Sequence, residues 1–486
     1  MPDNVLKLNS REERWAAGQA CRDKVSRVSQ AKFNPKARKF DPIELMKRAH
    51  KGRVPDLIPL KFARMAATPF TFYRGAAPLM AADLAALPRT GIDVQICGDA
   101  HVQNLGAYGG GADGHLIFDI NDFDETIKGP WEWDVKRMAS SLILAGREAR
   151  NSEGTCKDAV GQFSRTYRKT MKHLSEVSVI ELARYQVTRH LHVSPVISVL
   201  RKAEHATAQS TLEKLGVKAG GNYQIKELRD PTYGIPIQYR VPESTAKQVL
   251  AALPGYLQTL LTERHHFFRQ YVPADVGFRI VGTGSVGTRD YVVLMFAGAI
   301  EDPLFLQLKQ ELPSAYNDYL PKSNPPKHDG QRVVFGVRRM LVQFDIFMGW
   351  ATIDGLPYLV RQLRDHKAGI ESTDLEGNGL LQYAEVCGEL LAKGHARSGD
   401  PCMLSGYLGE ADRFDKALVT FAVDYADQDT RDFEALLKAI KAGRIEVQKP
   451  TASKVVTKTR KHKKEKKAPA KTKAKSKGTK KPKKGD

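Results

Sequence analysis

The stretch GFRIVGTGSVGTRDYVVLMFAGAIEDPLFLQLKQEL, residues 277–312, is the clearest β region of the chain. It predicts a strand, a glycine turn, a β-branched strand, an acidic turn and a third strand. The glycines of GTGSVG, residues 282–287, would let the backbone approach phosphate groups, and Lys309 on the next strand could pair with them. A tight hairpin turn explains the glycines about equally well. Because a strand and not a helix follows, a flap over nucleotide phosphates is favoured over a dinucleotide-binding loop.

A second motif lies nearer the N-terminus, in CGDAHVQN at residues 97–104, and it is followed by FDINDFDE at residues 118–125. Phosphoryl transfer needs a carboxylate that accepts the proton of the attacking hydroxyl, and it needs carboxylate and amide oxygens that hold Mg²⁺. Asp99, Asn104 and the acidic group of Asp119, Asp122 and Asp124 supply this set. The sequence between the two motifs, LGAYGGGADGHLIFDI, predicts a hairpin about a glycine-rich turn.

Turn chemistry offers a plainer explanation, because Asp and Asn are common in turns and at helix caps for structural reasons. For one such residue this explanation is favoured, but three carboxylates within six residues repel one another without a cation. We therefore predict a nucleotide site with a catalytic base and a metal-binding group. The predicted base is Asp99, the predicted metal ligands are Asn104, Asp119 and Asp122, and the predicted nucleotide-binding residues are Gly282, Gly284, Ser285, Gly287 and Lys309.

The rest of the chain predicts an α+β protein of several units. Residues 216–242 are rich in glycine and proline and suggest an irregular connection, which a helix at about 244–270 follows. The stretch QRVVFGVRRMLVQFDIFMGW, residues 331–350, is expected to be helical. The predicted units are an N-terminal helical arm (1–60), a lobe with the CGDAH turn and helices (61–270), a glycine-loop β lobe (271–365), C-terminal helices (366–448) and a disordered tail (449–486).

Charge is concentrated in that tail. The 486 residues have a net charge of +21, and residues 449–486 contain 17 basic and two acidic residues, so the tail carries +15 and the remainder +6. A basic tail predicts contacts with nucleic acid or another polyanion through residues 449–486, and does not make the body a nucleic-acid-binding domain. The composition, 42% hydrophobic and 27% charged, excludes disorder throughout.

Cysteine usage and hydropathy indicate the compartment. Five cysteines, Cys21, Cys97, Cys156, Cys387 and Cys402, include no close pair, which argues against a disulfide framework or a cysteine-based zinc site. The N-terminus is too charged for a signal peptide, and the most apolar stretch, residues 291–300, is about half the length of a spanning helix. We expect a cytoplasmic protein that does not cross a membrane.

The motifs together resemble the catalytic core of protein kinases and aminoglycoside phosphotransferases. The segments RMAATPFTFYRGAA, ICGDAHVQNLGAY, FDINDFDETIKGPWEWDVKRMASSL, VGTGSVGTRDYVVLM, LFLQLKQE and YLVRQLRDHK resemble more closely still the bacterial family catalogued as domain of unknown function 2252. This resemblance runs from about Arg64 to Asp429. It implies a bilobal, kinase-like α+β fold, without an established substrate.

Chain order and two substitutions depart from the kinase pattern. GTGSVG follows CGDAH, which implies a circular permutation and requires Lys309 to lie near Asp122 in space. Cys97 replaces the usual histidine, and the stretch at 331–350 has no glutamate, with Phe335 at the expected place. Glu311, Asp345 or another carboxylate would then have to orient Lys309; otherwise a nucleotide-binding pseudoenzyme is plausible. Asp134 resembles the residue that steadies the catalytic turn in aminoglycoside phosphotransferases.

These observations predict a phosphotransferase that uses ATP and Mg²⁺ and acts on a hydroxyl acceptor. The alternative from another class is a non-catalytic nucleotide- or nucleic-acid-binding protein in which the Lys-rich tail dominates. The sequence leaves open the acceptor, the choice between phosphoryl and adenylyl transfer, the oligomeric state and the pathway.

Overall fold

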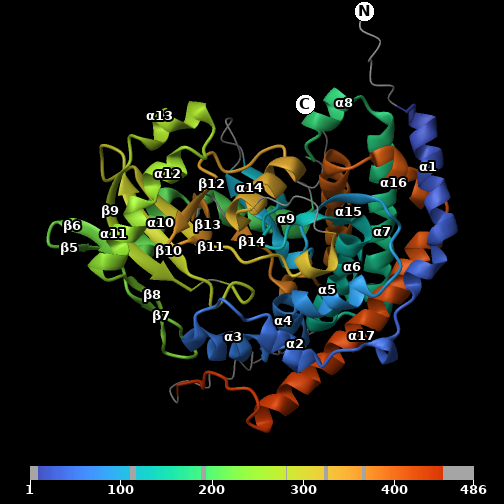
Figure 1. Ribbon diagram of the computed structural model, residues 1–486, viewed down its shortest axis with the longest axis horizontal. Coiled ribbons are helices and arrows are strands. Elements are labelled where there is room, and N and C mark those ends of the chain that lie inside the picture. The colour runs from blue at the N-terminus through green and yellow to red at the C-terminus, as the bar shows by residue number, and fades with distance from the viewer. Residues whose placement is uncertain are drawn as a thin grey trace, which may run out of the picture.

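A seven-stranded antiparallel sheet and a group of long helices form the two halves of the protein (Figure 1). The structure is a computed structural model, and the chain is mixed α+β. The residues described are 9–109, 116–187, 193–280, 282–321, 327–363 and 368–451. Most of the predicted tail, residues 452–486, therefore lies outside the described residues.

The large sheet has the strand order β12-β13-β11-β10-β9-β8-β7, and each neighbouring pair is antiparallel. The three strands predicted in residues 277–312 are confirmed as β9, β10 and β11, and Asp290 lies opposite Lys309. The strands are β7 (Leu228–Arg229), β8 (Pro236–Arg240), β9 (Val272–Arg279), β10 (Asp290–Phe296), β11 (Pro303–Gln310), β12 (Gly349–Ile353) and β13 (Leu356–Gln362).

Helices cover both faces of this sheet. Strand side chains alternate between the two faces, so Val293 and Leu306 on one face pack with Tyr256 and Phe268 from the short helices after β8. The opposite face meets α14 near β12 and β13, and Leu212 of α10 farther out. These helices are α10 (Ala208–Leu215), α11 (Glu243–Ala251), α12 (Leu253–Leu257), α13 (His265–Phe268) and α14 (Asp329–Met340).

Three expectations about this half were wrong in detail. The connection at 216–242 contains a hairpin of β5 (Gly216–Ala219) and β6 (Asn222–Ile225), and its later part supplies β7 and β8 to the sheet. The helix expected at 244–270 is three short helices, and Pro254 at the start of α12 lacks the N–H that would continue α11. The helix expected at 331–350 ends at Met340, and β12 begins at Gly349.

The other half is built on long helices around one apolar core. Trp131 is buried there and stacks on Tyr167 with ring centroids 5.7 Å apart. The helices that build this core and its margin are α6 (Trp131–Glu148), α7 (Glu153–Glu176), α8 (Val179–Arg184), α9 (Ser194–Glu204), α15 (Asn378–Ser398), α16 (Pro401–Leu408) and α17 (Arg413–Lys441).

Two small sheets carry the acidic motifs at the edge of the helical half. The predicted hairpin is confirmed, because β2 and β3 pair with Leu105 opposite Ile120. β1 ends directly before the CGDAH turn and pairs with β4, so this turn and the acidic stretch after β3 are held near each other. The strands are β1 (Asp93–Ile96), β2 (Leu105–Gly109), β3 (Leu116–Ile120), β4 (Ile127–Pro130) and β14 (Ala368–Gly369).

The N-terminal segment is helical and wraps the helical half. Gly18 of α1 touches α16 so closely that a Cβ there would lie 2.0 Å from the carbonyl oxygen of Met403. Farther along, α2 packs against α5 and α17. The helices are α1 (Arg11–Lys24), α2 (Pro42–Arg48), α3 (Ile58–Met65), α4 (Pro69–Gly75) and α5 (Ala77–Ala85).

Two expectations about the whole chain can be compared with the described residues. All five cysteines are free thiols. In the described ranges, no helix combines the length and the apolar character that a membrane span requires.

Candidate active site

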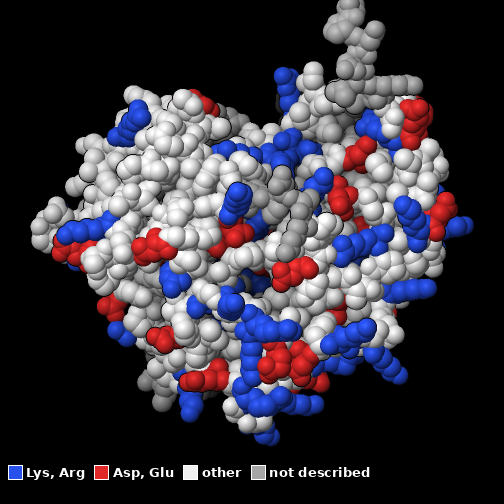
Figure 2. Space-filling view, viewed as in Figure 1, with Lys and Arg blue, Asp and Glu red and all other residues white. Residues whose placement is uncertain are grey.

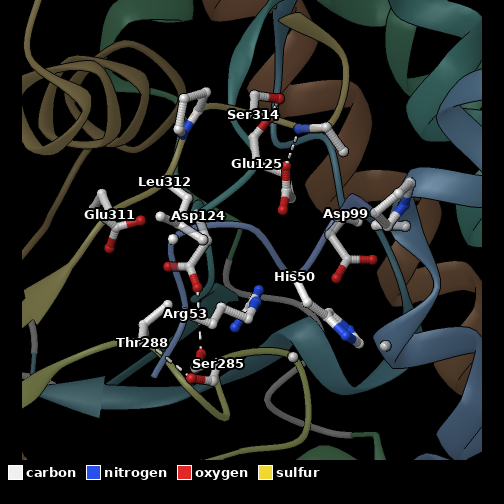
Figure 3. Close-up of a pocket in the computed structure, with 18 of the residues that line it drawn as sticks. His50, Arg53, Asp99, Asp124, Glu125, Ser285, Thr288, Glu311, Leu312 and Ser314 are labelled. Atoms are coloured by element: carbon white, nitrogen blue, oxygen red, sulfur yellow. Dashed lines mark hydrogen bonds between the residues drawn. The ribbon is translucent and has the colours of Figure 1, made fainter. Parts of the chain in front are cut away.

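A pocket of about 650 Å³ opens where the large sheet, the acidic motifs and the N-terminal segment meet. Figure 3 shows Asp99 and Asp124 on opposite sides of it, with Glu125 above and Ser285 below. The lining comes from six stretches of chain that are distant in sequence: 45–53, 74–78, 99–104, 122–125, 282–288 and 310–319, with Lys61 in addition.

The turn that presents Asp99 is tied to the helical core. The backbone N–H groups of Cys97 and Gly98 donate to the Asp134 carboxylate at 2.7 and 2.9 Å. Asp134 in turn lies 3.2 Å from Nε2 of His395. Gly98 has φ +82°, and a Cβ there would lie 2.2 Å from the carbonyl oxygen of Glu125, so the turn requires glycine. The structural role expected for Asp134 is confirmed.

A buried arginine faces the Asp99 carboxylate. Nε of Arg137 donates to Oδ1 of Asp99 at 2.6 Å, and the Asp99 side chain is 18% exposed. Burial raises the pKa of the Asp99 carboxyl above its ordinary value, although Arg137 acts in the opposite direction. Asp99 therefore lines the pocket with its carboxyl group fixed by Arg137. Its raised pKa makes the carboxylate a better proton acceptor.

Asn104 is held in the same turn. Its Nδ2 donates to the backbone carbonyl of Asp99 at 2.8 Å, and the residue ends a 3-10 turn that His101 caps by accepting from the N–H of Gln103. Asn104 lines the pocket with Asp99. The five-residue step seen in the sequence thus places an amide and a carboxylate in one rigid loop.

The acidic stretch divides at the end of β3. Asp119, still on the strand, is 1% exposed and forms an ion pair with the buried Lys393, and it does not line the pocket. Asp122, Asp124 and Glu125 follow the strand and do line it. The position of Asp119 therefore does not support the metal-binding role predicted for it. Motif spacing alone did not single out Glu125, whose Oε2 accepts from the N–H of Ala315 at 2.6 Å.

Lys309 reaches the site from β11. It is buried and forms an ion pair with Asp124, whose Oδ2 also lies 3.4 Å from the hydroxyl of Ser285. Burial lowers the pKa of Lys309, but the carboxylates of Asp124 and Asp122 more than offset it and hold the pKa above its ordinary value. Lys309 thus lies near Asp122 and Asp124, as the prediction required, but it is not among the residues that line the pocket.

The glycine loop forms the floor of the pocket, with Gly282, Gly284 and Ser285 among the lining residues. Gly287 has φ +92° and lies in the same turn, outside the lining. Nζ of Lys61 donates to the carbonyls of Thr283 and Gly284 at 3.1 and 2.7 Å.

The N-terminal segment holds this loop a second time. Arg53 donates to the carbonyl of Val286 at 2.8 Å, and the N–H of Val54 donates to Gly287 at 2.7 Å. No sequence signal identified Arg53 or Lys61, because each lies more than 200 positions before the loop that it contacts.

Helix α14 contributes an arginine to this region and contains no glutamate. Arg332 donates to the carbonyl oxygens of Asp124 and Thr126 at 2.9 and 2.7 Å. Glu311 is buried, its pKa is raised well above the ordinary value by burial, and its Oε1 has no hydrogen-bond partner among the described residues. Asp124 is thus the carboxylate that orients Lys309.

A metal ion would need ligands beyond the protein's carboxylates. Among the described residues, no three His, Cys, Asp or Glu side chains are grouped as a complete metal site. Mg²⁺ commonly uses one or two carboxylates together with substrate phosphates and water. Asn104 and Asp122 line one pocket and are oxygen donors of the kind Mg²⁺ prefers, so the donor set fits a metal that arrives with a nucleotide.

Comparison with known proteins gives a family and no function. Residues 53–439 match the model of the family described as an uncharacterized protein conserved in bacteria (DUF2252), and the chain belongs to this family. No curated protein and no solved structure matches the chain.

Proposed function

We propose that this member of the DUF2252 family is a phosphotransferase that uses ATP and Mg²⁺ and transfers the terminal phosphoryl group to a hydroxyl group of an acceptor. One observation carries the proposal. The turn with Asp99 and Asn104, the carboxylate of Asp122 and the glycine loop converge on one pocket, although the loop lies more than 150 positions later in the chain. A phosphoryl-transfer site requires these groups to meet in one pocket, whereas two unrelated structural turns have no reason to meet.

The strand order supports a kinase-like, circularly permuted fold as part of this proposal. The glycine loop joins β9 to β10, Lys309 lies on the third strand, β11, and helix α14 follows. Protein kinases place a glycine-rich loop, a strand lysine and a helix in the same succession. Here the turn with Asp99 precedes that unit in the chain.

Each residue has a distinct role in the proposed reaction. Asp99 accepts the proton of the attacking hydroxyl, and Arg137 keeps its carboxylate directed into the pocket. Backbone groups of the glycine loop hold the phosphates, and the ammonium of Lys309, which lies behind the pocket wall, reaches them by exchanging its contact with Asp124. Asn104 and Asp122 would hold Mg²⁺, which neutralises phosphate charge when bound. The acceptor oxygen forms a bond to phosphorus as the bond to ADP breaks.

Nucleotide binding is the first test. ATP with Mg²⁺ should raise the melting temperature, since a ligand that binds only the folded state at a hundredfold excess over its Kd stabilises by about 2.7 kcal/mol. Asp122→Asn should remove the Mg²⁺-dependent part of this shift. Asp318→Asn, which changes an exposed carboxylate in the same lining, should keep it. Absence of a shift with every nucleotide would overturn the proposal.

Turnover is the second test, and it separates catalysis from binding. Asp99→Asn retains the shape of the side chain but removes the proton acceptor, so ADP release from ATP and Mg²⁺ should fall about 10²- to 10⁴-fold. Nucleotide affinity should change little. If activity per folded molecule is unchanged, Asp99 is a structural turn residue.

A non-catalytic nucleotide-binding protein is the second candidate. It is favoured by one observation, that the ammonium of Lys309 is already paired with Asp124, which leaves it less available to phosphate groups. Nucleotide binding with no turnover in the unmodified protein would support this candidate.

A further inference from the structure

The cations that line the pocket are paired less fully than its carboxylates. Five cations line it, and among the described residues none forms an ion pair with a carboxylate. These cations are Arg48, Lys51, Arg53, Lys61 and Arg74.

Four of the six lining carboxyl groups are paired or have a pKa that burial raises, and the other two are Asp122 and the exposed Asp318. Asp99 is paired with Arg137 and Asp124 with Lys309, which both lie behind the pocket wall. Burial raises the pKa of Glu311 well above its ordinary value. The five lining cations have no carboxylate in direct ion-pair contact among the described residues, although Asp99 and Asp122 act on Arg74 from farther away. Burying a cation without a close partner is costly.

Two of these cations serve the glycine loop. Lys61 and Arg53 donate hydrogen bonds to carbonyl oxygens of residues 283–286. These bonds hold this part of the loop against the N-terminal segment.

The other three lining cations are Arg48, Lys51 and Arg74. Arg48 ends α2, Lys51 follows it, and both are exposed. In the lower centre of Figure 2, Lys and Arg side chains lie around α2 together with Asp and Glu side chains. Arg74, at the end of α4, is half-buried, and its Nε is shielded from solvent without a hydrogen-bond partner in the described part of the chain.

His50 completes this side of the pocket. The residue is 5% exposed, and its ring packs edge-on against Phe62 with ring centroids 4.7 Å apart. Neither ring nitrogen has a hydrogen-bond partner among the described residues. Figure 3 shows the ring on the side of the pocket where Asp99 lies. A buried neutral imidazole can donate or accept one hydrogen bond at each nitrogen, so it suits a polar ligand beside Asp99.

We propose that Arg48, Lys51, His50 and Arg74 form a subsite for a phosphate group carried by the acceptor, an inference that rests on the proposed function. Three cations balance a phosphate, with a charge of about −1.5 to −2, better than a single carboxylate. Guanidinium groups bind such oxyanions through paired hydrogen bonds. The acceptor is thus a phosphorylated hydroxyl compound, bound between the N-terminal arm and Asp99.

Inorganic phosphate is the probe, and calorimetry on the full chain is the measurement. Phosphate should bind in the presence of a saturating non-hydrolysable ATP analogue with Mg²⁺, because its subsite is separate from the nucleotide phosphates. Acetate at equal ionic strength should bind at least about tenfold more weakly. Loss of phosphate binding on saturation with the analogue, equal binding of acetate, or no phosphate binding would each overturn the proposal.

Variants locate the subsite. The double substitution Arg48→Gln with Lys51→Gln changes two exposed side chains, so it should leave the fold intact. It should weaken phosphate binding about tenfold or more, as should Arg74→Gln. Lys47→Gln is the matched control, since Lys47 lies on the same helix, pairs with Glu44 and is outside the lining. An equal loss in the control would reveal diffuse surface attraction and overturn the proposal.

The two proposals fail differently. If the analogue does not bind, the phosphotransferase proposal fails, while phosphate binding to the protein alone still shows whether Arg48 and Lys51 form an anion site. If the analogue binds and phosphate does not, only the acceptor subsite is refuted.

Discussion

The two ends of the acidic stretch at 118–125 form two Lys–Asp pairs in contrasting surroundings. Asp119 and Lys393 are sealed in the helical half, with side chains 1% and 0% exposed. Asp124 and Lys309 meet at the pocket, where the Asp124 side chain is 26% exposed and already contacts Ser285. The two ion pairs are chemically similar, and their aspartates lie five residues apart. The pair of Asp119 is structural, whereas the pair of Asp124 is available to a ligand.

The largest expected effect is a loss of stability at the buried pair of Asp119 and Lys393. Asp119→Asn leaves the Lys393 ammonium buried without its counter-charge, which should lower the free energy of unfolding by about 3–5 kcal/mol. Urea denaturation measures this loss. Asp124→Asn is the matched control and should cost less, because Asp122 remains close to Lys309. Equal losses at the two sites would contradict the contrast.

A smaller effect, on ligand binding and not on stability, is expected at the pair of Asp124 and Lys309. Lys309→Met should weaken ATP binding about 30- to 100-fold, which corresponds to the ~2–3 kcal/mol of a hydrogen bond to a charged group. Calorimetry with ATP and Mg²⁺ gives the affinity. A double-mutant cycle with Asp124→Asn shows whether the two side chains act together. Unchanged affinity in Lys309→Met would make this pair as purely structural as the sealed one.

The smallest effect concerns a third carboxyl, which is buried near Lys309 but not paired with it. Asp290 accepts from Gln307 at 2.7 Å, and its other oxygen has no hydrogen-bond partner among the described residues. Burial raises its pKa from 3.8 to about 7. Between these values the folded state binds more protons than the unfolded state, so its contribution to stability falls as pH rises.

Asp290→Asn should remove this dependence. The variant should match the unmodified protein near pH 4 and exceed its stability by about 1–3 kcal/mol at pH 8. Denaturation at several pH values is the measurement. A variant less stable at pH 8 would show that the ionised carboxylate is stabilised by Lys309 after all.

Local patterns carried much of the prediction. The hairpin of β2 and β3 and the strands β9 to β11 are confirmed. The failures lie where distant partners decide the outcome. β7 and β8 come from a glycine- and proline-rich stretch that becomes strand only because β9 offers an edge to pair with.

The amino-acid sequence by itself determined the alternation of strands, the glycine that permits the turn before Asp99, and the closeness of Asp99 to Asn104, because each depends on neighbours a few residues apart. Only the tertiary structure decided which acidic side chains reach the pocket, since strand β3 buries Asp119 against a helix more than 250 positions later. It also decided that Arg137 faces Asp99 and that Arg53 and Lys61 hold the glycine loop. Contacts of this kind depend on how separate elements pack, which no local spacing encodes.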